Sequence, residues 1–360
     1  MITTDLNARL SDNSPASLAA AAVPAIITKL NALPIFYCDA MVAESESFSP
    51  SAAKPLAVVA SWRKLGVALN IRAPEAITVK ELSTVHDSRY VVDVVDCRQS
   101  NGFGNRSPAV ARSLFYTNGA MLHAAREALS NRKVAIAPCS GFHHAAFDHG
   151  GGFCTFNGLM VTTKVLLDEG KVSRVGILDF DQHWGDGTHD IIRRLGLKNC
   201  VRHYHPFGCN AVQFTSDLPG IIKEFADCDL VLYQAGADPH IDDPLGGWLT
   251  TKQLQTRDRL VFKELKRLRI PVAWNLAGGY QRDDEGSIRP ILVVRLTLLA
   301  SLRGYKAQVA VEFGRQGVPA KVKPTSKQLE EFFLAINNRA KVDWRIALDD
   351  FFDSIGAERT

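Results

Sequence analysis

The sequence lacks a long apolar run and an excess of charge of either sign. A membrane-spanning helix needs about 18 or more consecutive apolar residues, and no run approaches that length, so we expect no membrane segment. Lysine and arginine number 42 against 38 aspartates and glutamates, a formal net charge of +4. Because nucleic-acid-binding surfaces usually concentrate positive charge, this near balance also predicts no nucleic-acid partner.

Closely spaced cysteines are absent as well. The seven cysteines are an odd number, lie far apart and include no C-x-x-C pair (Cys38, Cys97, Cys139, Cys154, Cys200, Cys209 and Cys228). This pattern favours reduced thiols and a cytoplasmic location. The apolar stretch at 17–27 is short and contains Pro24, which argues against a secretory signal.

Short runs rich in valine, isoleucine and leucine alternate with longer amphipathic segments. The runs are residues 35–38, 134–138, 175–180, 200–204, 230–234 and 271–276, and the expected helices are 109–129, 157–169, 218–225, 251–268 and 288–302. The alternation predicts one α/β domain with a central, mostly parallel sheet flanked by helices. We expect an N-terminal extension at 1–33, the domain at 34–313, and a basic loop and C-terminal helix at 314–360 that pack on it.

Polar clusters follow four of these runs, at 140–144, 181–187, 236–243 and 277–280. The carboxyl ends of parallel strands meet at one edge of a sheet, where ligands bind. We therefore expect these four clusters to form one site.

Two clusters carry candidate metal ligands. Asp179, Asp181 and His183 occupy every second position, so they project from one face near a strand end. Asp238 follows the apolar run at 230–234. Aspartate and histidine suit zinc, and ferrous iron is also compatible. Three ligands and one open position form a hydrolytic zinc site. The same aspartates could instead cap turns or pair with bases.

The other two clusters carry candidates for proton transfer. His143 and His144 are adjacent, and histidine titrates near neutrality; Asp179 and Asp186 could orient them. Tyr280 follows a turn of small residues and could donate to a developing oxyanion. Ordinary packing of these side chains is the alternative.

Taken together, these motifs resemble the histone deacetylase superfamily, which includes bacterial acetylpolyamine amidohydrolases. The similar segments occur in the order VHDSRYV at 85–91, SGFHHA at 140–145, GGGFCTFN at 150–157, DFDQHWGDGT at 179–188, GADPHIDDP at 236–244 and LAGGY at 276–280. The resemblance implies the arginase/deacetylase-like fold, a deacetylase catalytic domain at 34–313, and removal of an acetyl group from an amine.

The resemblance also implies a role for each site residue. Asp181, His183 and Asp238 would bind zinc, His144 oriented by Asp186 would be the general base, His143 backed by Asp179 would stabilise charge, and Tyr280 would bind the oxyanion. Phe153 would form a wall of the substrate tunnel, with Phe207 as its partner, and the Gly152 carbonyl would accept the amide proton. A structural potassium ion is expected near Asp179, Asp181, His183, His203 and Tyr204.

Three departures from the family concern the surroundings of the site. His203 stands where relatives often carry a hydroxyl residue, Trp184 replaces a second histidine, and residues 101–105 replace a longer acidic rim loop. The substrate is therefore expected to be an acetylated amine, either acetyl-lysine in a protein or a small molecule such as an acetylpolyamine. The oligomeric state and the acyl chain stay open.

Two other functions compete with this interpretation. A catalytically silent module could keep the fold and bind an acylated ligand. A two-manganese ureohydrolase would need carboxylates where this chain has Gly185 and His240. The intact tyrosine and histidine pair argue against the first, and the missing carboxylates argue against the second.

Overall fold

The computed structural model describes residues 32–64, 68–207 and 210–292. Nearly all of the expected extension at 1–33, the whole segment 314–360 and most of the expected helix at 288–302 lie outside these residues.

None of the described helices combines the length and the apolar character that crossing a membrane requires.

Seven strands form one sheet in the order β2-β1-β3-β7-β6-β4-β5, with every neighbouring pair parallel. The strands are β1 (Leu33–Phe36), β2 (Leu69–Arg72), β3 (Val134–Ala137), β4 (Val175–Asp179), β5 (Val201–Tyr204), β6 (Leu230–Gln234) and β7 (Val272–Asn275). The sequence prediction of a parallel α/β sheet is confirmed. The edge strand β2 was missed because its residues are only half-buried and form no strongly apolar run.

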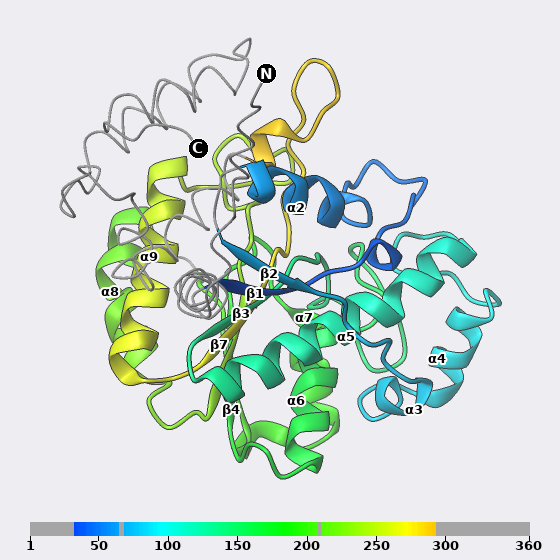
Figure 1. Ribbon diagram of the computed structural model, residues 1–360, viewed down its shortest axis with the longest axis horizontal. Helices are drawn as coiled ribbons and strands as arrows, with labels where there is room; N and C mark the ends of the chain where they lie inside the picture. Colours follow the sequence, from blue (N-terminus) through cyan, green and yellow to red (C-terminus); the bar gives the residue numbers. More distant parts are fainter. Residues whose placement is uncertain (1–31, 65–67, 208–209, 293–360) are drawn as a thin grey trace, which may run out of the picture.

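The described helices connect these strands and cover the sheet (Figure 1). They are α2 (Lys54–Lys64), α3 (Val79–Leu82), α4 (Ser88–Val95), α5 (Pro108–Asn131), α6 (Gly158–Asp168), α7 (Asp186–Arg194), α8 (Ala211–Lys223) and α9 (Thr251–Leu268), with short 3-10 helices at Asp39–Met41 and Leu197–Asn199. Figure 1 shows α8 and α9 on one side of the sheet and α5 and α6 on the other. Trp274 of β7 packs on Trp62 of α2 and Phe262 of α9, which places α2 on the α9 side.

Local sequence signals explain where the long helices begin. Ser107 caps α5, and Pro108 occupies its first turn, where a missing backbone N–H costs nothing. Thr250 and Gln253 form a capping box at the start of α9. Asn210 caps α8, so this helix begins earlier than residue 218, the start predicted from the sequence.

The sheet order determines where the site lies. Strands β3, β7, β6 and β4 are adjacent in the middle of the sheet. The four polar clusters follow these four strands, so parallel pairing brings all of them to the same edge. The sheet beneath them is closely packed, and every residue of these four strands is buried.

Truncating a side chain in this central sheet should strongly destabilise the protein. We expect Leu232→Ala on β6 to lower the free energy of unfolding by about 2–5 kcal/mol, because it leaves a cavity in a fully buried position. Leu56→Ala, at a side chain that is 51% exposed, is the control and should change it by less than about 0.5 kcal/mol. Chemical denaturation measures both, and equal effects would contradict the described core.

Candidate metal centre and active site

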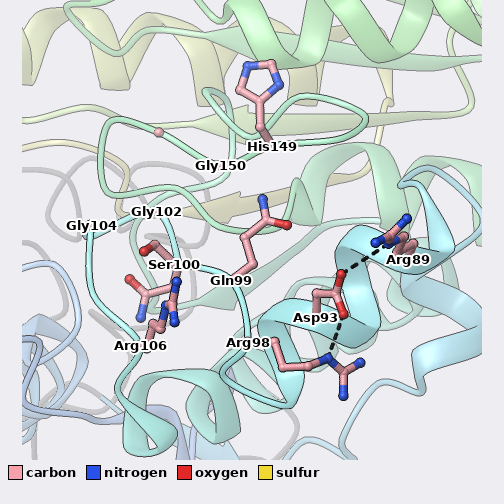
Figure 2. Close-up of a pocket in the computed structure, with 12 residues that line it drawn as sticks. Arg89, Asp93, Arg98, Gln99, Ser100, Gly102, Gly104, Arg106, His149 and Gly150 are labelled. Carbon is pink, nitrogen blue, oxygen red and sulfur yellow. Dashed lines mark hydrogen bonds and ion pairs between the residues drawn. The ribbon is translucent and has the colours of Figure 1, made fainter.

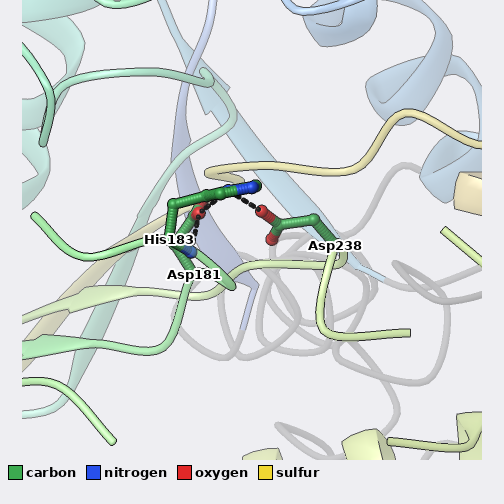
Figure 3. Close-up of side chains that lie close together, drawn as sticks. All are labelled: Asp181, His183 and Asp238. Carbon is green, nitrogen blue, oxygen red and sulfur yellow. Dashed lines mark hydrogen bonds and ion pairs between the residues drawn. The ribbon is translucent and has the colours of Figure 1, made fainter. Parts of the chain in front are cut away.

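Asp181, His183 and Asp238 form a compact cluster of ligand atoms. One atom from each side chain lies within 4.8 Å of the others, so the three could hold a metal ion. The Nδ1 atom of His183 is 3.2 Å from Asp181 Oδ1 and 3.2 Å from Asp238 Oδ2 (Figure 3). Asp181 and His183 come from the loop after β4, and Asp238 comes from the loop after β6.

The environment of Asp238 fits a bound cation. Its side chain is completely buried, and neither carboxylate oxygen has a hydrogen-bond partner among the described residues. Burial and the nearby charge of Asp181 raise the pKa of Asp238 to about 8. Since a buried unpaired carboxylate is costly, a cation shared with Asp181 would offset this cost. Two carboxylates and one imidazole suit zinc or ferrous iron.

The imidazole of His183 is held in an orientation that suits a ligand. Its Nε2 atom is 3.2 Å from the carbonyl oxygen of Leu245. An Nε2–H that donates to this carbonyl leaves the lone pair of Nδ1 directed between the two aspartates. Leu245 would therefore fix the tautomer of His183 in a metal-bound site.

Glycines allow the backbone to approach the two carboxylates. The amide of Gly278 donates to Asp181 Oδ2 over 2.8 Å. A Cβ atom on Gly278 would come within 2.3 Å of the Asp238 carboxyl carbon, and one on Gly236 within 2.6 Å of the Asp181 Cα. These contacts exclude any side chain at either position.

His143 and Asp179 form a buried pair next to this cluster. His143 Nδ1 is 2.9 Å from Asp179 Oδ2, and His143 Nε2 is 3.5 Å from Asp181 Oδ1. Burial alone would lower the pKa of His143, but Asp179 and Asp181 outweigh burial and raise it to about 9. The same pairing keeps the pKa of Asp179 well below its usual range despite complete burial. His143 is therefore charged at neutral pH.

His144 has the opposite electrostatic environment. Its Nδ1 is 2.6 Å from Asp186 Oδ1, and its ring centroid is 4.0 Å from that of His143. Burial and the positive charge of His143 lower the pKa of His144. Two adjacent titratable groups with opposite pKa shifts can divide the roles of acid and base.

Tyr280 lies nearby with its hydroxyl kept protonated. Burial, together with the charges of Asp181 and Asp238, raises its pKa far above the usual value. Its backbone amide donates to Asp243 Oδ2 over 2.8 Å, which fixes the turn that carries it. The tyrosine can therefore act as a hydrogen-bond donor at any physiological pH.

Aromatic rings surround the approach to these groups. The Phe153 ring lies 5.6 Å from Tyr280 and 5.3 Å from Phe48. The residue before it, Gly152, is so close to His144 that a Cβ atom would be 2.4 Å from the imidazole Cδ2. Gly152 thus lies against the histidine pair and Phe153 against Tyr280, and their roles in substrate binding stay predictions.

Phe207 as the partner of Phe153 across the tunnel stays a prediction. The rings within reach of Phe207 are those of Trp184 and His205, and no contact with Phe153 is found among the described residues. Phe48, which is 58% exposed, is the ring that contacts Phe153 edge-on. No periodicity in the sequence signals that Phe48 reaches the site.

Lys54 is a second residue that the sequence did not reveal. It begins α2, yet its side chain is completely buried. Its Nζ donates to the carbonyl oxygen of Ala277 over 3.1 Å and lies 5.7 Å from the centre of the Tyr280 ring. Ala277 has a φ of +52°, a strained conformation for a residue with a side chain. A buried cation therefore supports the turn that carries Tyr280.

A third unpredicted residue, Arg257 of α9, contacts the loop after β4 that carries Asp181 and His183. Its guanidinium is almost fully buried, pairs with Asp258 over 2.8 Å, and donates to the carbonyl of Phe180 over 3.1 Å. Phe180 is the residue between Asp179 and Asp181. The periodic pattern of α9 predicts only the helix, because Arg257 and Asp258 look like surface residues in sequence.

The predicted potassium ligands are less well matched. His203 lies on β5 with its Nε2 3.6 Å from Asp179 Oδ2, and its ring stacks on Trp184. Potassium takes oxygen ligands, and the His203 side chain offers none. A potassium ion near Asp179 thus stays a prediction that depends on backbone carbonyls, including that of Tyr204.

Comparison with known proteins identifies the family. The model of the histone deacetylase domain matches residues 50–200 and 210–291. Acetylpolyamine amidohydrolase 1 of Pseudomonas aeruginosa is 48% identical over 177 residues, which cover 40% of this chain and 50% of that protein. Histone deacetylase 2 of Arabidopsis thaliana is 30% identical over 180 residues, covering 43% and 46%. An uncharacterised protein of Picosynechococcus is 30% identical over 195 residues, covering 48% and 64%.

These alignments span less than two thirds of the curated relatives' own length. Solved structures extend the similarity of the fold. An acetylpolyamine aminohydrolase from Burkholderia pseudomallei has a TM-score of 0.60 at 17% identity, covering 76% of this chain and 99% of that one. The HDA15 HD domain has a TM-score of 0.62 at 19% identity, covering 89% and 99%. The matched domain, which includes nearly every site motif, shows that this chain belongs to the histone deacetylase family.

Proposed function

We propose that the protein is a zinc-dependent deacylase that hydrolyses the amide of an acetylated amine such as acetyl-lysine. One observation carries the proposal. A three-ligand cluster that holds two buried carboxylates against one imidazole adjoins two histidines whose pKa values shift in opposite directions. Family membership supports deacetylase chemistry.

Asp181, His183 and Asp238 would hold the zinc ion, which when bound polarises the amide carbonyl and lowers the pKa of a water molecule. Ferrous iron would suit the same ligands. The neutral His144, oriented by Asp186, accepts the proton of the attacking water. The Tyr280 hydroxyl donates to the oxygen of the tetrahedral intermediate.

The remaining residues position the substrate and complete proton transfer. The charged His143, paired with Asp179, stabilises the negative charge that develops near it. One member of the histidine pair then returns a proton to the leaving amine, which releases acetate and the free amine. Phe153 and Phe48 would flank the aliphatic stem, and the Gly152 carbonyl would accept the amide proton.

The geometry opposes the two-metal ureohydrolase. A Cβ atom on Gly185 would lie 2.4 Å from Asp179 Oδ2, which leaves no room there for a carboxylate. His240 is buried, and its Nε2 is 2.8 Å from Thr251 Oγ1. Neither Gly185 nor His240 thus leaves room for the carboxylate that a second metal ion would need. The protonated Tyr280 and the histidine pair likewise favour an enzyme over a silent binding module.

Removing either reactive side chain should abolish most turnover. We expect His144→Ala to lower kcat about 10²- to 10⁴-fold, and Tyr280→Phe about 10²- to 10³-fold. The assay uses zinc-loaded protein. It measures the release of acetate from acetyl-lysine peptides and acetylpolyamines, and the release of the longer carboxylic acid from longer acyl-lysines. Tyr116→Phe on α5 is the matched tyrosine control. Unchanged rates in both site variants would overturn the mechanism, and zinc binding without turnover of any amide would favour the silent module.

Lys54 should act as a positioning residue for Tyr280. We expect Lys54→Met to lower kcat at least about tenfold, because the strained Ala277 turn loses the interaction that holds the oxyanion donor. Lys54→Arg should restore part of the rate, since it also donates to the Ala277 carbonyl. KM and zinc content should change little in either variant. A loss of thermal stability with an unchanged kcat in the folded protein would show a purely structural role.

Zinc affinity should rise with pH. Without metal, the pKa of Asp238 is raised to about 8, and the adjacent carboxylates of Asp181 and Asp238 raise that of His183 to about 10. Both groups hold protons at pH 7, and zinc must displace them. We expect the apparent affinity to increase roughly tenfold per pH unit for each proton released between pH 6 and 8. Competition with a chelator measures the zinc affinity at each pH. An affinity that does not depend on pH would contradict a site whose ligands Asp238 and His183 hold protons without metal.

A further inference from the structure

A second hollow lies beside the proposed tunnel. It has a volume of about 770 Å³ and is lined by residues of α4 and of the two loops at 98–106 and 149–151, namely Arg89, Asp93, Arg98, Gln99, Ser100, Asn101, Gly102, Gly104, Arg106, His149, Gly150 and Gly151. This volume lies within the range of about 300–1,000 Å³ typical of small-molecule sites. Figure 2 shows Arg106 and Arg98 on opposite sides of the hollow, with Gln99 between them.

This hollow, which we call the arginine pocket, adjoins the tunnel wall directly. Gly150 and Gly151 line it, and the next two residues are Gly152 and Phe153 of the tunnel. The Phe153 amide donates to the carbonyl of Gly102 over 3.0 Å. A Cβ atom on Gly102 would lie 2.1 Å from the carbonyl oxygen of Cys154. The two loops are therefore in close contact, and the pocket begins one residue before the tunnel wall in the chain.

The lining carries an excess of positive charge. Three arginines face one aspartate, Asp93, which pairs with Arg98 over 2.8 Å and with Arg89 over 3.6 Å. Asp96, outside the lining, also pairs with Arg98. Arg106 is exposed, and no ion pair is found for it among the described residues.

Acidic side chains near the tunnel are elsewhere. Glu44 and Glu46 are exposed on a neighbouring loop, where the Asn105 amide donates to the carbonyl of Ser45 over 2.5 Å. Neither glutamate lines the arginine pocket. They are exposed acidic groups that could attract a cationic substrate instead.

We propose that the arginine pocket selects acylated amines that carry a carboxylate or phosphate beyond the aliphatic stem. The inference rests on the proposed deacylase function and specifies its substrate class. Guanidinium groups match the geometry of both anions and form charge-assisted hydrogen bonds with them. A polyamine would place its ammonium groups near the same arginines, where like charges repel. The specificity thus differs from what the name of the Pseudomonas relative states for that protein.

Four matched substrates test the proposal. They are N-acetylated alkylamines of one chain length whose far end carries an ammonium, methyl, carboxylate or phosphate group. At low ionic strength we expect the anionic pair to exceed the ammonium compound at least about tenfold in kcat/KM, and salt to reduce the difference. A preference for the ammonium or methyl compound would overturn the proposal. If the protein prefers the ammonium compound and Glu46→Gln loses this preference, the loop that carries Glu44 and Glu46 selects the substrate instead.

Arginine variants test whether the arginine pocket causes the preference for anionic substrates. We expect Arg106→Ala and Arg98→Ala to lower the carboxylate-to-methyl ratio of kcat/KM about three- to tenfold each. Arg126→Ala, which removes an exposed arginine paired with Glu169 instead, is the control and should leave the ratio unchanged. An unchanged ratio in both pocket variants would contradict the proposal.

Direct binding separates this inference from the deacylase function. Calorimetry with the zinc-loaded protein compares the carboxylate and methyl compounds whether or not they are hydrolysed. Tighter binding of the carboxylate compound that Arg106→Ala abolishes would support the pocket even if no amide is turned over, and in that case only the proposed function fails. Equal binding of the two compounds would refute the pocket.

Discussion

The burial of three carboxylates at one edge of the sheet is the constraint on which the site depends. Asp179, Asp181 and Asp238 are all almost completely buried. Asp181 and Asp238 place ligand atoms within 4.8 Å of each other, and His143 contacts both Asp179 and Asp181. Such a concentration of acidic groups is unfavourable unless cations or bound protons compensate it. His143 compensates Asp179, whereas the ion-pair partner of Asp238 among the described residues is the partly exposed His183. The fold therefore provides a position that a divalent cation would stabilise.

The charges of these carboxylates also determine the chemistry of their neighbours. They keep His143 protonated, and its positive charge in turn helps to keep His144 neutral. They also keep the Tyr280 hydroxyl protonated. One buried cluster thus places a charged imidazole, an imidazole of lowered pKa and a protonated hydroxyl within a single site. Lys54 and Arg257 add fixed positive charge and hydrogen bonds to the loops that carry these residues.

Sequence reasoning located the parts of the site that follow directly from strands. Apolar runs predicted β3, β4, β6 and β7, and parallel pairing then required their polar ends to meet. It did not find Phe48, Lys54 or Arg257, because each reaches the site through tertiary packing and none lies in a polar cluster directly after one of the four central strands. Lys54 contacts Ala277 across 223 positions of the chain. Local patterns carry no information about such a distant contact.

The metal content of the purified protein tests the account most directly. Elemental analysis after zinc loading and removal of free metal should give one zinc ion per chain. Asp238→Asn, which keeps the shape of the side chain and removes its charge, should lose most of this zinc while the protein stays folded. Two metal ions per chain, or full zinc content in Asp238→Asn, would contradict a mononuclear centre built on the buried carboxylates.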